Sequence, residues 1–320
     1  MFYTFLIQKH LLYILNSKFN KVIKNRCFKY IMSNQSSFSG KTKTFCLIGH
    51  PVEHSMSPTM WNPALQELGL DYVYIAFDVL PDNLEKAVNG FRVLGIEGIN
   101  VTITHKEAII KYLDEIDPIA DKMGAINTIK NEDGFLKGRN TDAGGAKKSL
   151  LDAGCSISGK KILILGSGGV ARALCYILSE EAEKIVLTDI LEERALNLAK
   201  EIKDKMNIEV IGKISNESTI KEEIKDTNLL INATSLGMYP KVNKSPISKE
   251  LLHSDLFVFD VIYNPLETKL MKEAAEIGCK TLGGIDMLVN QGVLAFEWWT
   301  GKEPNANLMK NKIVSFLAIK

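Results

Sequence analysis

A glycine-rich turn in the middle of this chain constrains its fold more than any other feature. An apolar run over residues 161–165 ends in the turn Gly166-Ser167-Gly168-Gly169-Val170-Ala171, and a helix-like stretch follows. The spacing G-x-G-x-x-A is typical of dinucleotide-binding folds. The first glycine permits a tight bend, the second lets the backbone approach a pyrophosphate, and the last small residue lets the helix pack on the strand. The free N–H groups at the start of that helix favour an anion. We therefore predict that Gly166, Gly168, Gly169, Val170 and Ala171 bind a dinucleotide cofactor.

A second apolar run, residues 184–188, supports this interpretation because it ends in Thr188 and Asp189. Asp189 lies close to the offset of about 20 residues at which an acidic side chain meets the ribose 2′-hydroxyl of NAD. Such a carboxylate repels the 2′-phosphate of NADP, whereas Arg194 could neutralise that phosphate and Thr188 could donate to it. Thr188, Asp189 and Arg194 are therefore further candidate cofactor residues. The alternative is a glycine-rich turn in an α/β protein that binds no nucleotide.

Length and composition fit a two-domain protein that contains such a fold. A chain of 320 residues favours two domains. Its 39 Lys and Arg nearly balance 38 Asp and Glu, so charge gives no reason to expect nucleic acid or a membrane as a partner. The five cysteines are scattered, without a metal-binding spacing. We therefore expect a reducing, cytoplasmic location and no metal site.

Residues 1–41 differ from the rest and are predicted to be an N-terminal extension outside the fold. Their apolar stretch is interrupted by Gln8, Lys9 and His10, so it is too short to span a bilayer. The basic residues mostly follow the apolar cluster, whereas in a signal peptide the basic residues precede the apolar core. An amphipathic anchor and an organelle transit sequence are alternatives. A third is that Met32 is the real start of the protein.

From residue 42 onwards, strand-like and helix-like segments alternate. Strands are expected near 45–48, 72–79, 99–102 and 125–129, and helices near 60–68, 84–94 and 106–113. This order predicts a mainly parallel sheet covered by helices, that is, a three-layer α/β domain.

The second half of the chain continues the alternation. After the apolar runs at 161–165 and 184–188, further strand candidates lie at 208–211, 229–232, 257–261 and 280–282. Six strands are the number in a doubly wound Rossmann-type domain. We therefore predict an α/β protein with a substrate domain over residues 42–141, completed by C-terminal helices from residues 286–320. The dinucleotide-binding domain is expected over residues 142–285.

Four clusters of polar side chains occur in the first domain. They are Ser55 with Ser57, Asn100–Lys106, Gly124–Thr128 and Asn140–Asp142. Each cluster alone is explained by the capping of helices and turns. Several of them follow strand ends, where open α/β sheets bind ligands. Together they predict a pocket for a small, hydroxyl-rich, anionic substrate.

Lys106 is the candidate acid–base group in this pocket. It is expected in the first turn of a helix, where its charge opposes the helix dipole and does not serve stability. Hydride transfer to a carbonyl requires a proton for the developing alkoxide. Lys106 beside a carboxylate such as Asp142 could deliver that proton and stabilise the reacting oxygen. His105 is expected only to flank the site.

These motifs resemble those of the shikimate/quinate dehydrogenase family over nearly all of residues 43–317. The matching segments are IGHPVEHSMSP (48–58), NVT (100–102) with Lys106, GAINT (124–128), NTD (140–142), NAT (232–234), YNPLET (263–268) and MLVNQG (287–292). The resemblance implies an oxidoreductase that uses NADP or NAD. Its implied reaction is the reduction of 3-dehydroshikimate to shikimate in aromatic amino acid biosynthesis.

The resemblance also implies roles for individual residues. Lys106 and Asp142 would form the catalytic pair. Ser55 and Ser57, assisted by Tyr263, would bind the substrate carboxylate. The residues implied to contact ring hydroxyls are Thr102, Asn127, Asp142 and Gln291. Gly284 would lie near the nicotinamide. We keep a homodimer as a candidate assembly.

Three departures from the family pattern carry expectations of their own. Thr104 replaces a usual proline and removes its fixed φ, so Lys106 is expected to be held less firmly. Asp286 replaces a glycine and is expected to bring a charge near the cofactor. NADP-using members carry Asn-Arg-Thr after the second strand of the cofactor domain, where this chain has Thr188-Asp189-Ile190.

Two functional alternatives stay open. One is an NAD-linked quinate/shikimate dehydrogenase of catabolism, which Asp189 favours, while the serine pair favours shikimate as substrate. The other, from a different class, is a non-catalytic sensor of shikimate or quinate. A sensor has less need of Lys106 and Asp142.

Overall fold

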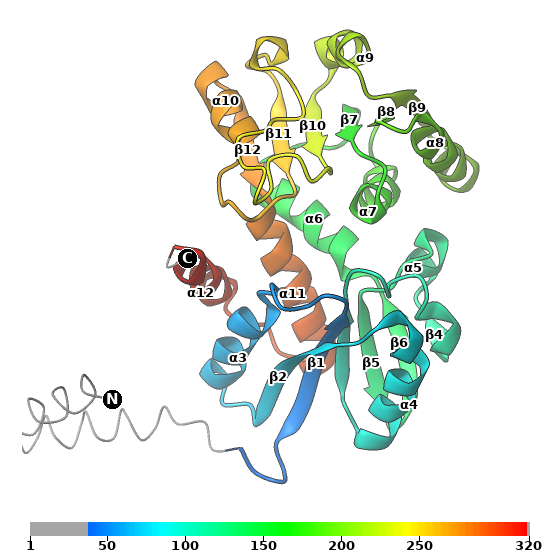
Figure 1. Ribbon diagram of the computed structural model, residues 1–320, viewed down its shortest axis with the longest axis vertical. Coiled ribbons are helices and arrows are strands. Elements are labelled where there is room, and N and C mark those ends of the chain that lie inside the picture. Colours follow the sequence, from blue (N-terminus) through cyan, green and yellow to red (C-terminus); the bar gives the residue numbers. More distant parts are fainter. Residues whose placement is uncertain (1–37, 319–320) are drawn as a thin grey trace, which may run out of the picture. The chain divides into compact units, whose positions relative to one another are not determined.

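The apolar runs around the glycine-rich turn pair into one sheet in the computed structural model, which describes residues 38–318 (Figure 1). Its six strands are β7 (Lys161–Leu165), β8 (Lys184–Asp189), β9 (Glu209–Ile214), β10 (Leu229–Asn232), β11 (Phe257–Asp260) and β12 (Lys280–Gly283). All neighbours are parallel, in the order β12-β11-β10-β7-β8-β9. This is the strand order of a doubly wound dinucleotide fold, which confirms the predicted Rossmann-type class.

The four inner strands, β7, β8, β10 and β11, are apolar on both faces, so both faces need a cover. In β7, Ile162 and Ile164 belong to one core cluster, whereas Leu163 and Leu165 belong to another. Alternate residues of a strand point to opposite faces, which separates the two sets. The helices of this part are α7 (Gly169–Leu178), α8 (Glu192–Met206), α9 (Glu217–Glu223) and α10 (Lys269–Ile277). α7 begins inside the glycine-rich turn, as the motif predicts.

The first part of the chain forms a second sheet, which is mixed. Its strands are β1 (Lys43–Gly49), β2 (Tyr72–Asp78), β3 (Gly98–Val101), β4 (Glu115–Ile116), β5 (Thr128–Glu132) and β6 (Phe135–Arg139), in the order β2-β1-β3-β5-β6-β4. β1 is parallel to β2 and β3, but β5 is antiparallel to both of its neighbours. The sequence predicted β1, β2 and β3, placed β5 three residues too early, and missed β4 and β6, which pair in parallel with each other. Asp133 and Gly134, with φ of 54° and 91°, form the two-residue turn of the β5–β6 hairpin.

The helix predicted for residues 106–113 is wrong. After β3 the chain makes turns, and only a short 3₁₀ helix, η2 (Ile110–Tyr112), follows. Thr104 has a φ of 79°, which lies outside the helical region. The carbonyl of Lys106 accepts a hydrogen bond from the distant N–H of Ile126 (2.8 Å) and so is drawn away from a helical ladder. Lys106 therefore does not stand in the first turn of a helix, and no helix dipole opposes its charge.

The remaining helices cover the first sheet and connect it to the second. They are α3 (Ser57–Glu67), α4 (Leu84–Leu94), α5 (Pro118–Met123), α6 (Thr141–Asp152), α11 (Gly284–Thr300) and α12 (Ala306–Leu317). α6 packs along α11, and α12 packs on α3 (Figure 1).

The C-terminal helices contact elements of the first sheet and its cover. The ring of Trp299 lies 4.8 Å from that of Phe45, and the ring of Phe296 lies 5.1 Å from that of Trp61. The domain boundaries at residues 141/142 and 285/286 stay predictions, and residues 1–37 of the predicted extension lie outside the described residues. Within residues 38–318, no helix combines the length and the apolar character needed to cross a membrane.

Candidate active site

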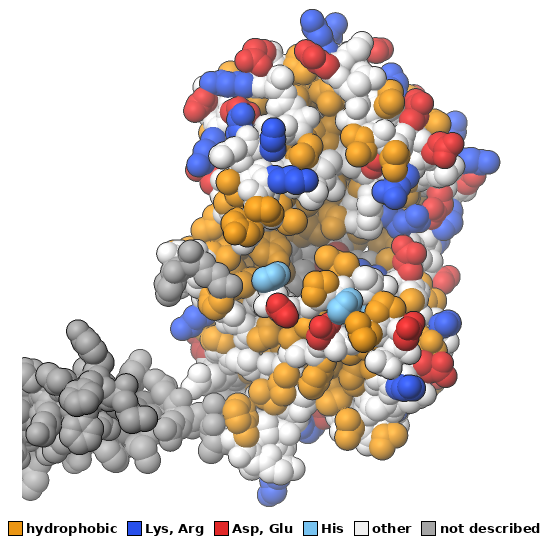
Figure 2. Space-filling view, viewed as in Figure 1, with side chains coloured by type: hydrophobic (Ala, Val, Ile, Leu, Met, Phe, Trp, Pro, Cys, Tyr) orange, Lys and Arg blue, Asp and Glu red, His pale blue; other side chains and the backbone are white. Residues whose placement is uncertain are grey.

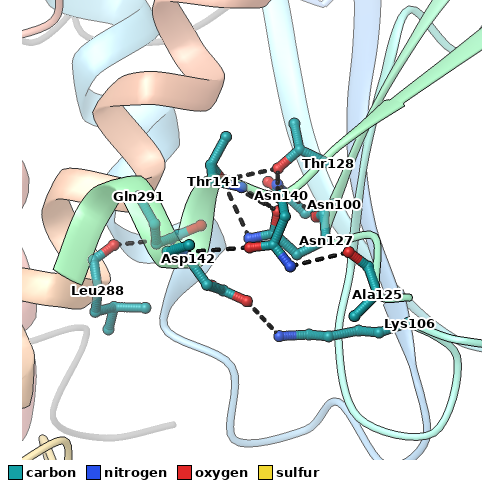
Figure 3. Close-up of polar contacts among 11 residues, drawn as sticks. Asn100, Lys106, Ala125, Asn127, Thr128, Asn140, Thr141, Asp142, Leu288 and Gln291 are labelled. Atoms are coloured by element: carbon teal, nitrogen blue, oxygen red, sulfur yellow. Dashed lines mark hydrogen bonds and ion pairs between the residues drawn. The ribbon is translucent and has the colours of Figure 1, made fainter. Parts of the chain in front are cut away.

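Lys106 and Asp142 form an ion pair that joins the turns after β3 to the start of α6. Lys106 Nζ lies 2.5 Å from Asp142 Oδ2 (Figure 3). Asp142 stands in the first turn of α6, and Lys106 lies in the turns after β3. Their side chains are 30% and 18% exposed, respectively, so a small molecule can reach both. Figure 2 shows a hollow in the surface between the parts that carry the two sheets.

One short segment, residues 125–127, fixes both members of this pair. The N–H of Ile126 donates to the carbonyl of Lys106 (2.8 Å). Asn140, the residue that caps α6, donates from Nδ2 to the carbonyl of Ala125 (2.9 Å). The N–H of Thr141 donates to Oδ1 of Asn127 (2.7 Å; Figure 3). The GAINT motif therefore sets the position of the Lys106 backbone relative to the start of α6.

Behind this segment lies a buried network of amides and hydroxyls. Asn127 is 3% exposed and its Nδ2 donates to Thr141 Oγ1 (3.1 Å). Thr128 Oγ1 accepts from Asn100 Nδ2 (3.1 Å), and Asn100 Oδ1 accepts from the hydroxyl of Tyr74 (2.7 Å). The side chain of Asn127 thus already has several partners in the protein. Tyr74 was not identified from the sequence, because a single tyrosine in a strand carries no local signal of such a contact.

The other predicted substrate residues come from several elements. Ser55 lies in the loop before α3, and its Oγ accepts from the N–H of Ser57 (3.3 Å). Ser57 opens α3 and is 7% exposed. Thr102 follows β3. Gln291 lies on α11 with 8% exposure, and its Nε2 donates to the carbonyl of Leu288 (2.8 Å; Figure 3).

Tyr263 lies in the loop between β11 and α10, within the part of the chain that forms the cofactor sheet. Burial raises the pKa of its phenol. The phenol therefore keeps its proton at neutral pH and can donate a hydrogen bond to an anion.

The glycine-rich turn has the shape and the free space that a pyrophosphate needs. Gly166 has a φ of 98°, and a Cβ there would lie 2.9 Å from the carbonyl oxygen of Ala233. At Gly168 and Gly169 a Cβ would meet nothing within 4 Å, so the start of α7 is open to a ligand. Val170 is partly buried, and Ala171 is completely buried against the core. These features fit a dinucleotide.

Asp189 is held beside that turn by three hydrogen bonds. Its Oδ2 accepts from the N–H and the Oγ of Ser167 (3.0 and 2.7 Å), and its Oδ1 accepts from the N–H of Leu191 (3.0 Å). Burial alone would raise the pKa of Asp189, but the hydrogen bonds from Leu191 and Ser167, with the charge of Arg194, outweigh burial and lower the pKa. Asp189 is therefore a fixed carboxylate at neutral pH, with the exposed Arg194 near it.

Two other expectations change with the structure, whereas the place of Gly284 near the nicotinamide stays a prediction. Thr188 is 0% exposed and its Oγ1 has no partner among the described residues, so it points into the core and cannot reach a phosphate. A Cβ on Gly284 would lie 2.0 Å from the carbonyl oxygen of Val261, which is a packing reason for that glycine. Asp286 does not stand free beside a cofactor: it pairs with Lys310 Nζ of α12 (2.6 Å).

Two family models of shikimate dehydrogenase domains match this chain, and so do curated shikimate dehydrogenases. Residues 47–129 match the shikimate dehydrogenase substrate binding domain, and residues 284–313 match the shikimate 5′-dehydrogenase C-terminal domain. A shikimate dehydrogenase (NADP(+)) of Methanocaldococcus jannaschii is 48% identical over 277 residues, which cover 86% of this chain and 98% of that protein. One from Moorella thermoacetica is 43% identical over 84% of this chain and 91% of its own length.

Solved structures agree in fold. A shikimate dehydrogenase in complex with NADP+ superposes with a TM-score of 0.83 at 45% identity, covering 88% of this chain and 98% of that one. Shikimate 5-dehydrogenase from Listeria monocytogenes, in complex with shikimate and NAD, gives 0.82 at 37% identity over 86% and 98%. Quinate dehydrogenase from Corynebacterium glutamicum, in complex with NAD, gives 0.80 at 30% identity over 86% and 99%.

Proposed function

This chain belongs to the shikimate dehydrogenase family, and we propose that Lys106 and Asp142 carry out the proton transfer of its reaction. The protein is an NAD(P)-dependent oxidoreductase of the shikimate pathway, and it reversibly reduces 3-dehydroshikimate to shikimate. The observation that carries the proposal is the 2.5 Å contact between Lys106 Nζ and Asp142 Oδ2. Both groups remain partly exposed there and can meet a substrate.

When bound at the glycine-rich turn, NADP or NAD supplies or accepts the hydride. Lys106 then has two tasks at the substrate oxygen. Its ammonium donates a proton to the oxygen as negative charge develops, and in the reverse direction the amine takes that proton back. Asp142 holds the ammonium in place and accepts a hydrogen bond from a substrate hydroxyl.

The substrate is held by groups that suit a hydroxylated carboxylate. We assign the carboxylate to the hydroxyls of Ser55 and Ser57 and to the phenol of Tyr263. Hydroxyls donate to an anion without leaving an unpaired charge when the site is empty. We assign the ring hydroxyls to a second group of residues: Thr102, Asn127, Asp142 and Gln291. The buried network behind Asn127 supports this by fixing its amide.

An NAD-linked quinate/shikimate dehydrogenase is the second candidate, because the fixed carboxylate of Asp189 suits a ribose hydroxyl. Initial rates with shikimate and quinate, each with NAD and NADP, distinguish the two candidate functions.

A cytoplasmic location is part of the proposal, and the buried free thiols of Cys46, Cys155, Cys175 and Cys279 support it. A homodimer stays a prediction.

Replacing Lys106 with alanine tests the proposed function. A positioned acid–base group contributes about 10²–10⁴-fold, so Lys106→Ala should lower kcat for shikimate oxidation by that factor. The side chain is partly exposed, so circular dichroism and Tm should change little. Lys111→Ala, at an exposed lysine in the same segment, is the matched control and should keep normal turnover. Near-normal turnover of Lys106→Ala would remove Lys106 from the mechanism.

A further inference from the structure

The residue two positions before Lys106 has an unusual backbone conformation. Thr104 has a φ of 79°, in the left-handed region that β-branched residues rarely adopt. Proline, the usual family residue at this position, has φ fixed near about −65° and cannot take this conformation. The turn that leads into Lys106 is therefore built differently from a turn that contains proline.

The side chain of Thr104 contacts the ring of the next residue. Thr104 Oγ1 lies 3.1 Å from Nδ1 of His105, and Nε2 of that ring lies 2.7 Å from the carbonyl oxygen of Val79. A carbonyl only accepts, so Nε2 donates to Val79, and in the neutral imidazole Nδ1 then accepts from the hydroxyl of Thr104. His105 is 0% exposed, so water cannot replace either partner.

These contacts hold the backbone immediately before Lys106, and the hydrogen bond from Ile126 to the Lys106 carbonyl holds it immediately after. We propose that Thr104 and His105 are positioning residues, which through Val79 fix the Lys106 backbone so that Nζ stays beside Asp142. The proposal rests on the proposed function of Lys106. It matters for rate because a lysine side chain is long and flexible, and a misplacement of about 1 Å can cost about 10²-fold in turnover.

The test removes only the hydroxyl of Thr104. Thr104→Val keeps the β-branched shape and loses the donor to His105, whereas Thr104→Ser keeps the donor and is the matched control. Thr104 is exposed, so neither variant leaves a cavity. We expect kcat of Thr104→Val to fall about 10- to 100-fold, with KM for shikimate and cofactor close to wild type. Thr104→Ser should keep most of kcat. Normal kcat in Thr104→Val, or an equal loss in both variants, would overturn the proposal.

A double-mutant cycle shows whether Thr104 acts through Lys106. If it does, adding Thr104→Val to Lys106→Ala lowers the residual turnover no further, because the positioned group is already gone. A further loss as large as that in the wild-type background means that Thr104 acts elsewhere. The two proposals fail separately. Normal turnover of Lys106→Ala refutes the proposed function, whereas an inactive Lys106→Ala with a fully active Thr104→Val refutes only the positioning role.

Discussion

At residue 189 a single carboxylate is placed where it could affect the choice of cofactor. Asp189 can accept from the 2′-hydroxyl of NAD, and it repels the 2′-phosphate of NADP. For unit charges 4 Å apart the repulsion is about 1 kcal/mol in water and about 4 kcal/mol at an effective dielectric of about 20. Since each 1.4 kcal/mol is about tenfold in affinity, repulsion alone would give a preference for NAD of about ten- to several-hundred-fold. Arg194 would reduce this preference, so we predict that NAD is used at least as well as NADP. Measured kcat/KM for both cofactors at fixed shikimate checks this.

The variants around Asp189 separate charge from geometry. Asp189→Ala removes the carboxylate and should narrow the difference between the cofactors. Ser167→Ala removes one hydrogen bond to Oδ2 and leaves the backbone N–H of residue 167 in place, so it should retain most of the preference. Curated relatives carry the name shikimate dehydrogenase (NADP(+)). A clear NADP preference in the wild type would mean that Arg194 neutralises the phosphate despite Asp189.

The serine pair, Ser55 and Ser57, gives a second prediction about individual residues. Hydrogen bonds to a charged group contribute about 1.5–3 kcal/mol each. The Ser55→Ala, Ser57→Ala double variant should therefore raise KM for shikimate more than it lowers kcat, because the carboxylate does not react. Steady-state kinetics over a range of shikimate concentrations measures both constants. An unchanged KM would place the substrate carboxylate elsewhere.

The role of a single residue could be predicted where the residue belongs to a motif. It could not be predicted where packing determines which way the side chain points. The polar clusters and the family resemblance singled out Lys106 and Asp142, which the structure brings into contact. Thr188 was assigned to the cofactor because it adjoins Asp189 in sequence. Neighbouring strand residues point to opposite faces, and Thr188 is the one that faces the core. The hydrogen bond between His105 and Val79 could not be predicted either, since the two residues lie 26 positions apart.

At the scale of elements, the site depends on how closely α6 approaches α11. α6 carries Asp142 and α11 carries Gln291. A Cβ on Gly145 would lie 2.6 Å from the backbone nitrogen of Gln291, and backbone atoms cannot rotate away. Gly145→Ala should therefore push the helices apart, destabilise the fold by about 1–3 kcal/mol and lower kcat/KM for shikimate. Thermal melting and kinetics on the same sample measure both effects.

Gly90→Ala is a suitable control, because a Cβ there meets nothing within 4 Å and alanine favours helix by about 1 kcal/mol over glycine. It should leave kcat/KM unchanged and keep or raise Tm. If Gly145→Ala behaves in the same way, the two helices tolerate separation, and their close contact is not needed to align Asp142 with Gln291.

Elements were predictable from sequence where hydrophobic pattern alone determines them. The four inner strands of the Rossmann-type sheet are apolar on both faces and were predicted close to their observed bounds. The helix expected after Thr102 failed because long-range hydrogen bonds, such as Ile126 to Lys106, override local helix preference. β6 was missed because its five residues include Lys137, Gly138 and Arg139.

Over the whole molecule, charge is almost balanced, with 39 basic and 38 acidic side chains. Net repulsion is therefore small at neutral pH, and sensitivity to acid depends on particular carboxylates whose pKa folding lowers. Glu223 of α9 is the most buried of these at 6% exposure. Its Oε2 lies 2.8 Å from Lys161 Nζ of β7, and its Oε1 lies 2.5 Å from Lys213 Nζ of β9. Glu223 thus ties one helix to two strands of the cofactor sheet.

Glu223→Gln should therefore reduce stability in a way that depends on pH. Burial alone would raise the pKa of Glu223, but the hydrogen bonds from Lys161 and Lys213 outweigh it and lower the pKa. A lowered acid pKa stabilises the fold above the unfolded value of about 4.3 and loses this effect as pH falls through the folded value. We expect Glu223→Gln to lower the free energy of unfolding by about 1–3 kcal/mol at pH 7, and this difference should shrink as pH falls below about 4.

Glu222→Gln is the matched control. Glu222 is 71% exposed and 3.9 Å from Lys213 Nζ, so this variant should lower the free energy of unfolding by at most about 1 kcal/mol. Denaturant unfolding of both variants between pH 7 and pH 3 tests this, and a loss for Glu223→Gln that stays constant with pH would contradict the ion-pair argument.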